Sequence, residues 1–273
     1  MPAFDDRSQR AGLADPTPLH ISPPTPSPIH LSPSLRVDRG ATAHEVKFLL
    51  TEETARELEQ RATGGMILDP HTDPALGNAY RTTTLYCDSP TFHVFHGIGP
   101  GRKRKHRVRR YGLADFAFLE RKTKRGSQVT KRRTTILLEE LTALSEPPCG
   151  SEWPGEWFRE RLQKRAMRPV CRVTYDRTAY AGDTAEGPLR LTFDRRLRGQ
   201  TSFGWDLTPV LHGPDLLEGL VIVEFKFEGA LPSMSKQVIE ALRLEPKSAS
   251  KYRRCVLGTG LEVGVPVLAP KPR

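Results

Sequence analysis

Segments in which apolar and polar residues alternate recur along most of the chain. This alternation is typical of β-strands, because successive side chains of a strand point to opposite faces of its sheet. The clearest segments cover residues 45–49, 80–86, 106–111, 116–124, 171–175, 189–194 and 221–227. Many strands with few helices between them predict an α+β fold with a mainly antiparallel sheet.

Helical patterns interrupt the strands at four places. Thr51 can cap a helix whose first turn is acidic and whose apolar side carries Ala55, Leu58 and Ala62. Further helices are expected over residues 136–144, after Pro154 and after Ser233. These helices are too few to form a core by themselves, so we expect them to pack on the sheet.

The charged residues of the predicted strands repeat with the period of the strand. Three strands carry a glutamate followed two residues later by a lysine, and another carries two arginines two apart. These residues are Glu45 and Lys47, Glu120 and Lys122, Glu224 and Lys226, and Arg107 and Arg109. An ordinary sheet with one solvated face would explain each strand taken singly. If the sheet closes into a barrel, however, the charges converge on its interior.

Converging cations repel one another unless water or anions surround them. Arginine and lysine suit phosphate oxygens, and glutamates among them suit Mg²⁺ or Mn²⁺ bridging to phosphates. A basic wall with a carboxylate metal site is what phosphoryl transfer requires. The alternation therefore indicates a site for a phosphate-rich substrate and a divalent metal.

Composition sets limits on this interpretation. The chain has 273 residues and a net charge of +10, which favours an anionic partner. It has no apolar run long enough to span a membrane and no secretory signal, and its four cysteines lack metal-ligand spacing, so we expect a cytoplasmic protein with reduced thiols. Residues 1–41 are rich in Pro and Ser and are predicted to be a disordered tail, and residues 259–273 form a second tail.

Eight short motifs in order resemble a known family. They are His44-Glu45-Val46-Lys47-Phe48-Leu49, Tyr86-Cys87-Asp88-Ser89-Pro90, Lys105-His106-Arg107-Val108-Arg109-Arg110-Tyr111-Gly112, Phe118-Leu119-Glu120-Arg121-Lys122-Thr123-Lys124, Tyr175-Asp176-Arg177-Thr178-Ala179-Tyr180, Arg190-Leu191-Thr192-Phe193-Asp194, Val223-Glu224-Phe225-Lys226 and Ser250-Lys251-Tyr252. Over residues 42–258 the chain resembles the VTC (vacuolar transporter chaperone, or polyphosphate polymerase) domain of the triphosphate tunnel metalloenzyme superfamily.

The resemblance implies an antiparallel β-barrel tunnel with helices packed on the outside. It implies transfer of the γ-phosphate of ATP to polyphosphate, assisted by Mn²⁺ or Mg²⁺. The implied catalytic residues are Lys47, Arg107, Arg109, Lys122, Arg190 and Lys251, with Lys124, Lys131 and Lys226 as further phosphate ligands. Glu224 would be the main metal ligand, with Glu45 and Glu120 as further candidates.

Two departures from the family pattern keep alternatives open. Superfamily triphosphatases often begin with Glu-x-Glu-x-Lys, whereas Ala43 stands at the first position here. Arg177 shares the alternation of Val173 and Tyr175, so an inward position would need a bulge or a strand end.

The alternatives are a triphosphatase or nucleotide cyclase in the same tunnel, and a non-catalytic module that binds polyphosphate or RNA. ATP and polyphosphate, or another triphosphate, are the expected ligands, and nucleic acid is less expected. The family also allows a membrane-protein partner.

Overall fold

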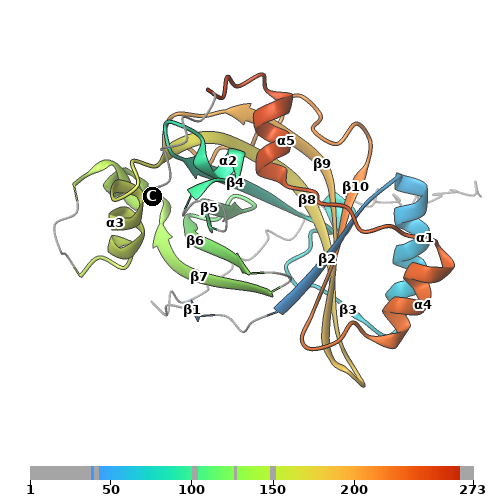
Figure 1. Cartoon of the computed structure of the whole chain (residues 1–273). Coiled ribbons are helices and arrows are strands. Elements are labelled where there is room, and N and C mark those ends of the chain that lie inside the picture. The colour runs from blue at the N-terminus through green and yellow to red at the C-terminus, as the bar shows by residue number, and fades with distance from the viewer. Residues whose placement is uncertain (1–37, 40–42, 100–103, 126–127, 148–151, 265–273) are drawn as a thin grey trace, which may run out of the picture. The chain divides into compact units, whose positions relative to one another are not determined.

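A computed structural model describes residues 38–39, 43–99, 104–125, 128–147 and 152–264 (Figure 1). Most of the predicted N-terminal tail lies outside the described residues, apart from strand β1 (Asp38–Arg39), which pairs with β7. The predicted C-terminal tail is described only as far as residue 264. The predictions made for both tails therefore stay predictions.

Eight antiparallel strands close into a barrel, which confirms the predicted fold (Figure 1). Around the ring they are β7 (Gln128–Leu137), β2 (Ala43–Leu50), β10 (Val221–Phe227), β9 (Gly187–Thr201), β8 (Arg168–Thr184), β4 (Tyr80–Asp88), β5 (Arg104–Tyr111) and β6 (Phe116–Arg125). Strand β6 pairs back to β7 and completes the circle, and the short β3 (Ile67–Leu68) pairs with β8.

The register places the alternating charges on the inner face. Glu224 on β10 is the partner of Lys47 on β2, and Arg107 on β5 is the partner of Glu120 on β6. Partners in a ladder point to the same face of a sheet. The apolar positions that alternate with them, such as Phe48 and Phe225, are fully buried on the outer face. The barrel therefore has an ionic interior and an apolar exterior covered by helices.

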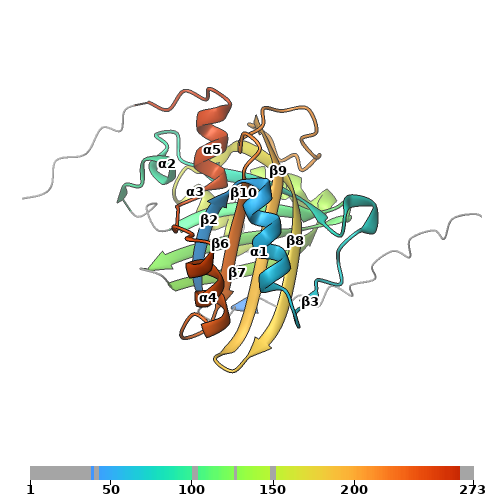
Figure 2. The same cartoon turned by 90° about the vertical axis from the view of Figure 1, so that its right-hand side faces the viewer.

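Helices α1 (Glu52–Ala62) and α4 (Ser233–Ala241) pack on the outer face of β2, β10 and β9 (Figure 2). Thr51 caps α1 as expected, because its hydroxyl accepts the Thr54 amide, and Ala55, Leu58 and Ala62 are buried. The helix expected after Ser233 begins at Ser233 itself, and the residue before it is Pro232. The Ser233 hydroxyl donates to Glu186.

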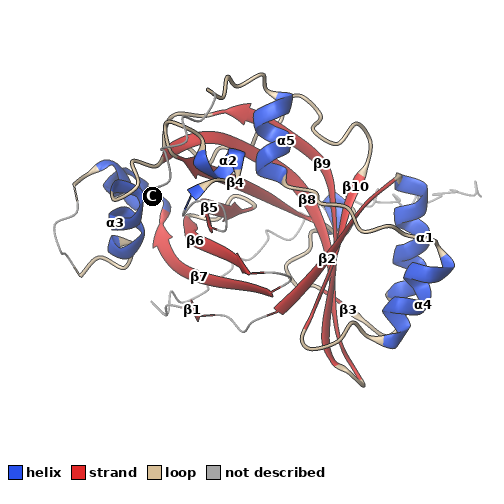
Figure 3. Cartoon of the chain, in the orientation of Figure 1, coloured by secondary structure: helices blue, strands red, loops and turns tan. Residues whose placement is uncertain are grey.

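Helix α3 (Glu156–Gln163) and the 3-10 helix η3 (Leu138–Ser145) cover the outer face of β4, β5 and β6 (Figure 3). The start of the helix predicted over residues 136–144 was wrong. Ile136 and Leu137 still belong to β7, because their alternation continues the strand before η3 begins. A second 3-10 turn, η1 (Pro74–Leu76), precedes β4.

Helices α5 (Lys251–Gly258) and α2 (His93–His96) cover one end of the barrel's inner face. Tyr86, Cys171 and Val173 lie on the same face as Arg107 by register, and they pack against Tyr252 of α5. The hydroxyl of Tyr252 donates to Asp88 at 2.5 Å, and Asp88 also accepts amides at the start of α2. This end of the interior is thus apolar.

Candidate phosphate and metal site

Glu120 is the centre of the largest ionic cluster in the interior. Its carboxylate is fully buried and accepts from Arg107 Nε at 2.7 Å and from Arg133 Nε at 2.8 Å. Lys131 Nζ and Arg109 Nη1 lie 3.9 and 4.0 Å away. Burial opposes ionisation, but the surrounding cations lower the pKa of Glu120 well below its usual range. The carboxylate therefore fixes the arginine forks in position.

A second cluster joins two of the three predicted metal ligands, Glu45 and Glu224. Lys122 Nζ donates to Glu45 at 2.7 Å, and Lys47 Nζ lies 3.1 Å from the same carboxylate. Lys47 also forms an ion pair with Glu224. Burial raises the pKa of Glu45, but Lys122 and Lys47 outweigh it and lower the value to about 2. Two carboxylates therefore converge on one ammonium group.

Asp194 organises a third cluster with Arg177 and Lys251. Arg177 Nε donates to it at 2.6 Å, and Lys251 Nζ from α5 at 2.5 Å. Arg177 was expected to need a bulge or a strand end to face inward, because it shares the alternation of Val173 and Tyr175. That expectation was wrong, since Val173 and Tyr175 themselves lie on the inner face, beneath α5. A bulge does occur between β8 and β9, but the extra residue is on β9, so the alternation of β8 continues unbroken.

Three further predicted residues, Arg190, Lys124 and Lys226, face the interior outside these three clusters. Arg190 Nη2 donates to Asp69 at 2.6 Å and to the Tyr80 hydroxyl at 3.2 Å, and its side chain is 38% exposed. Lys124 and Lys226 share the inner alternation but are exposed. They carry positive charge near the ends of β6 and β10, outside the buried clusters.

Several interior lysines are held close to deprotonation. Burial is the largest cause, and neighbouring cations add to it. It lowers the pKa of Lys122 to about 7 and those of Lys47, Lys105 and Lys131 to about 8. A bound polyanion would reverse this effect, because negative charge beside an ammonium group raises its pKa.

The donor set fits a divalent cation at one place. Glu45 and Glu224 offer hard carboxylate oxygens, and the Lys47 ammonium lies between them as a stand-in cation. Glu120 already neutralises four cations and has no exposed surface. Within the described ranges no cluster of three or more His, Cys, Asp or Glu side chains could hold a metal. Phosphate oxygens and water would have to supply the remaining ligands.

Four charged residues of the interior were not predicted as site residues. Each of them contacts a member of one of the three clusters or lies beside it, and they are Arg133, Lys105, Asp194 and Arg177. Lys105 and Asp194 stood within the recognised motifs and kept the inward alternation, which could have identified them. Tyr111 was also missed. Burial raises its pKa, but Arg109 and Arg133 outweigh burial and lower it to about 7.

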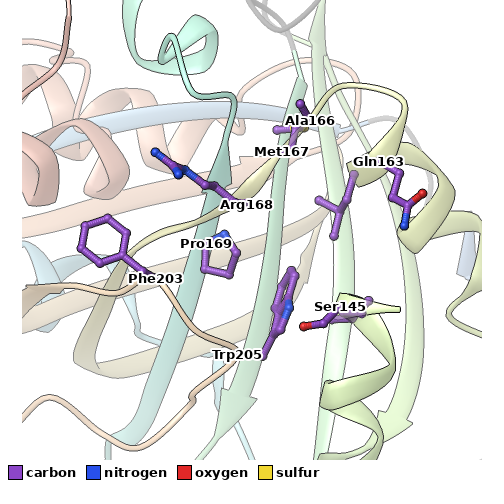
Figure 4. A pocket seen from close by; sticks show the side chains of 10 residues that line it. Ser145, Gln163, Ala166, Met167, Arg168, Pro169, Phe203 and Trp205 are labelled. Atoms are coloured by element: carbon purple, nitrogen blue, oxygen red, sulfur yellow. The ribbon is translucent and has the colours of Figure 1, made fainter. Parts of the chain in front are cut away.

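A cavity of about 520 Å³ lies outside this ionic interior. It is lined by residues of α3 and the turn after it, by the start of β8 and by Phe203 and Trp205 (Figure 4). Arg168 is the charged side chain of its lining. The cavity therefore has no part in the ionic site.

The family model that matches the chain is the VTC domain, over residues 42–258. The chain belongs to the VTC domain family. The match covers all the ring strands and helices α1 to α5, so the ionic interior is the interior of a VTC domain. No curated protein matches the sequence. The described part of this VTC domain protein also holds no helix with the length and apolar character needed to cross a membrane.

Solved structures similar to this VTC domain are distant in sequence. One is a candidate adenylate cyclase from Bacillus halodurans, 13% identical with a TM-score of 0.44, matched over 76% of this chain and 92% of that one. Another is a candidate adenylyl cyclase from Hippeastrum with a dominant triphosphatase activity, 14% identical with a TM-score of 0.42, matched over 82% and 99%. Likeness of this degree carries no argument about activity.

Proposed function

We propose that this VTC domain transfers the γ-phosphate of ATP to the end of a polyphosphate chain inside the barrel. The observation that carries the proposal is the convergence of inward lysines and arginines around a pair of carboxylates. The terminal oxygen of polyphosphate attacks the γ-phosphorus, the bond to the β-phosphate oxygen breaks, and ADP leaves. No side chain has to form a covalent intermediate.

The chain's own residues hold the phosphates in this proposal. Arg107 and Arg109, oriented by Glu120, bind equatorial oxygens through their planar forks. Lys122, Lys47 and Lys251 act as point charges that reduce repulsion between the two anions. Glu224 and Glu45 would hold Mn²⁺ or Mg²⁺, which would neutralise charge on the transferred phosphate. Lys47 would then pair with phosphate in place of the carboxylates.

Substitution of the proposed metal ligand tests this function. The full chain is incubated with ATP and Mn²⁺, and ADP, phosphate and polyphosphate length are read together. We expect long polyphosphate from the native chain and none from Glu224→Gln. The matched control is Glu228→Gln, which alters an exposed carboxylate just beyond β10 and should leave synthesis intact. Equal synthesis by Glu224→Gln would exclude the metal role.

The same assay separates the alternatives. ADP with free phosphate and no chain growth would indicate a triphosphatase, and cyclic nucleotide with pyrophosphate would indicate a cyclase. Salt-sensitive polyphosphate binding without turnover under any divalent metal would indicate a binding module. The interior cations suit a triphosphate in all three cases, so product identity decides among them.

A further inference from the structure

A second group of arginines lies on the outer wall of the barrel, facing away from the ionic interior. Arg121 on β6 and Arg132 on β7 are register partners. The residues next to them, Glu120 and Arg133, point into the barrel and pair with each other there. Arg104 keeps the outer alternation of β5. Arg161 belongs to α3, which packs beside β6, and Arg165 follows it (Figure 3). We name Arg104, Arg121, Arg132, Arg161 and Arg165 the outer arginine cluster.

Four of the five members of the outer arginine cluster carry positive charge that no ion pair of the described residues balances. Among the residues that the structure describes, Arg104, Arg121, Arg161 and Arg165 form no ion pair, and Arg121 Nε is buried without a hydrogen-bond partner. Burial and then repulsion by Arg104 and Arg161 lower the pKa of Arg165. A bound anion would relieve both penalties.

The aromatic residue at the centre of the cluster is already covered by guanidinium groups. Arg132 lies 4.0 Å from the Trp157 ring centroid and Arg121 lies 5.8 Å from it. The Trp157 indole donates to Thr134. Single-stranded nucleic acid is usually held by bases stacked on free aromatic rings. Arg132 already stacks on this ring, so a base would have to compete with it, and the cluster favours an anion that carries phosphates without bases.

The inner face of the same sheet adds a reason for a linear ligand. Arg121 and Arg132 stand on β6 and β7, the strands that also carry the interior ligands Lys122 and Lys131. The same two strands thus carry basic side chains on both of their faces, inside the barrel and outside it. Arginine forks bind phosphate oxygens through two parallel hydrogen bonds, so successive phosphates could each take one fork.

We propose that the outer arginine cluster binds linear polyphosphate outside the barrel and so retains chains that are too long for the interior. The inference rests on the proposed function, since its ligand is the product of that reaction. The cluster, in which Arg161 is exposed and the other four arginines are half-buried, provides a second contact outside the barrel, whereas the interior contacts the reacting end. Long chains should therefore bind more tightly than tripolyphosphate, and the difference should depend on these arginines.

Binding by the full chain tests the proposal without ATP. The probes are long-chain inorganic polyphosphate and tripolyphosphate, titrated at several salt concentrations. Arg161→Gln with Arg165→Gln should weaken long-chain binding about tenfold and reduce the slope of log affinity against log salt by about 2. Tripolyphosphate binding should not change. The matched control, Arg56→Gln with Lys236→Gln on α1 and α4, removes the same charge from helices that pack on other strands.

Three outcomes would overturn the proposal. They are unchanged long-chain affinity in the cluster variant, an equal loss in the control, and equal tenfold dependence on Arg161 and Arg165 for a single-stranded oligonucleotide or anionic lipid vesicles. Failure of the proposed function gives a different result, because absence of polyphosphate synthesis leaves these binding curves measurable. Conversely, loss of cluster binding leaves ADP release with short acceptors intact.

Discussion

At the scale of single residues, Glu120 shows how buried charge is made tolerable in this domain. Its side chain has no exposed surface, and a buried carboxylate is costly unless cations and hydrogen bonds compensate for lost water. Arg107 and Arg133 supply that compensation from the neighbouring strands. The arginines in turn need the carboxylate, because they would otherwise repel one another across the barrel.

Replacing Glu120 should therefore lower the stability of the domain more than it lowers the affinity for a divalent metal. Glu120→Gln leaves four cations without their shared counter-ion, and we expect the free energy of unfolding to fall by about 3–5 kcal/mol. Tripolyphosphate should restore part of the loss by supplying negative charge. Thermal unfolding with and without tripolyphosphate checks this, with Glu228→Gln as control. Unchanged stability with a lost response to Mn²⁺ would instead assign Glu120 to the metal.

The lowered pKa values of the interior lysines predict that a rise in pH has opposite effects on stability and on phosphate binding. Their pKa values of about 7 and 8 lie below the value of about 10.4 in an unfolded chain. Between pH 7 and 10 the unfolded chain therefore binds more protons, so the contribution of these lysines to stability rises with pH. Affinity for tripolyphosphate should fall over the same range, because neutral lysines attract phosphate weakly.

Calorimetric titration with tripolyphosphate at pH 7 and pH 9 measures the second effect. We expect several-fold weaker binding at pH 9. Lys122→Arg retains its charge at both values and should reduce the difference between them, since arginine does not deprotonate in proteins. Binding that is equally strong at pH 7 and pH 9 in the native chain would contradict the lowered lysine pKa values.

Much of the candidate site could be predicted from the sequence, because strand alternation depends only on neighbouring residues. Each Glu-x-Lys pair pointed inward as the period of two requires, and the motif order indicated the family. Arg177 was misjudged for a physical reason. Val173 and Tyr175 are apolar and were assigned to the outside, but α5 covers them within the barrel. Whether an apolar face meets a helix inside or outside is decided by tertiary packing.

At the scale of elements, a bulge in β9 lets α5 dock at the end of the interior. From Thr174 to Asp176 strand β8 advances by two residues, whereas its partner β9 advances by three, from Arg198 to Arg195. Arg196, within this bulge, has a φ of 53°. Beyond the bulge, Leu197 and Gly199 face α5, whereas Asp194 before it faces the cations. The predicted segment of this strand ended at Asp194, so the bulge was not foreseen from alternation.

Gly199 gives a direct test of how closely α5 must approach. A Cβ there would lie 2.7 Å from Cys255 Sγ and 2.6 Å from a Leu216 methyl carbon. Gly199→Ala should destabilise the domain by about 1–3 kcal/mol and displace α5, which carries Lys251. Tripolyphosphate affinity should fall with it.

Gly64→Ala is the matched control, because a Cβ at Gly64 meets nothing within 4 Å. Denaturant unfolding and phosphate titration of both variants provide the comparison. If both substitutions have the same small effect, α5 does not need the close approach at Gly199. The position of Lys251 would then depend on its ion pair with Asp194 and on the packing of Tyr252.

At the scale of the whole barrel, closure depends on a narrow seam. Within the described residues, strands β2 and β7 pair at two positions, Ala43 with Val129 and His44 with Gln128, whereas β8 and β9 pair along most of their length. The Lys122–Glu45 ion pair links β6 to β2 past this seam. Few backbone hydrogen bonds imply a low free energy of local opening at the seam.

A phosphate chain in the interior should strengthen the seam more than the rest of the barrel. It would contact Lys47 on β2 together with Lys122 and Lys131 on the other side, and so join strands that few hydrogen bonds connect. Amide hydrogen exchange with tripolyphosphate should therefore slow at residues 43–50 and 128–137 well before it changes at 187–194. Lys122→Met should remove most of this selective protection, whereas Lys236→Met on α4 should retain it. Equal slowing across all strands would show that the ligand stabilises the barrel globally, through the folding equilibrium, and does not act across the seam.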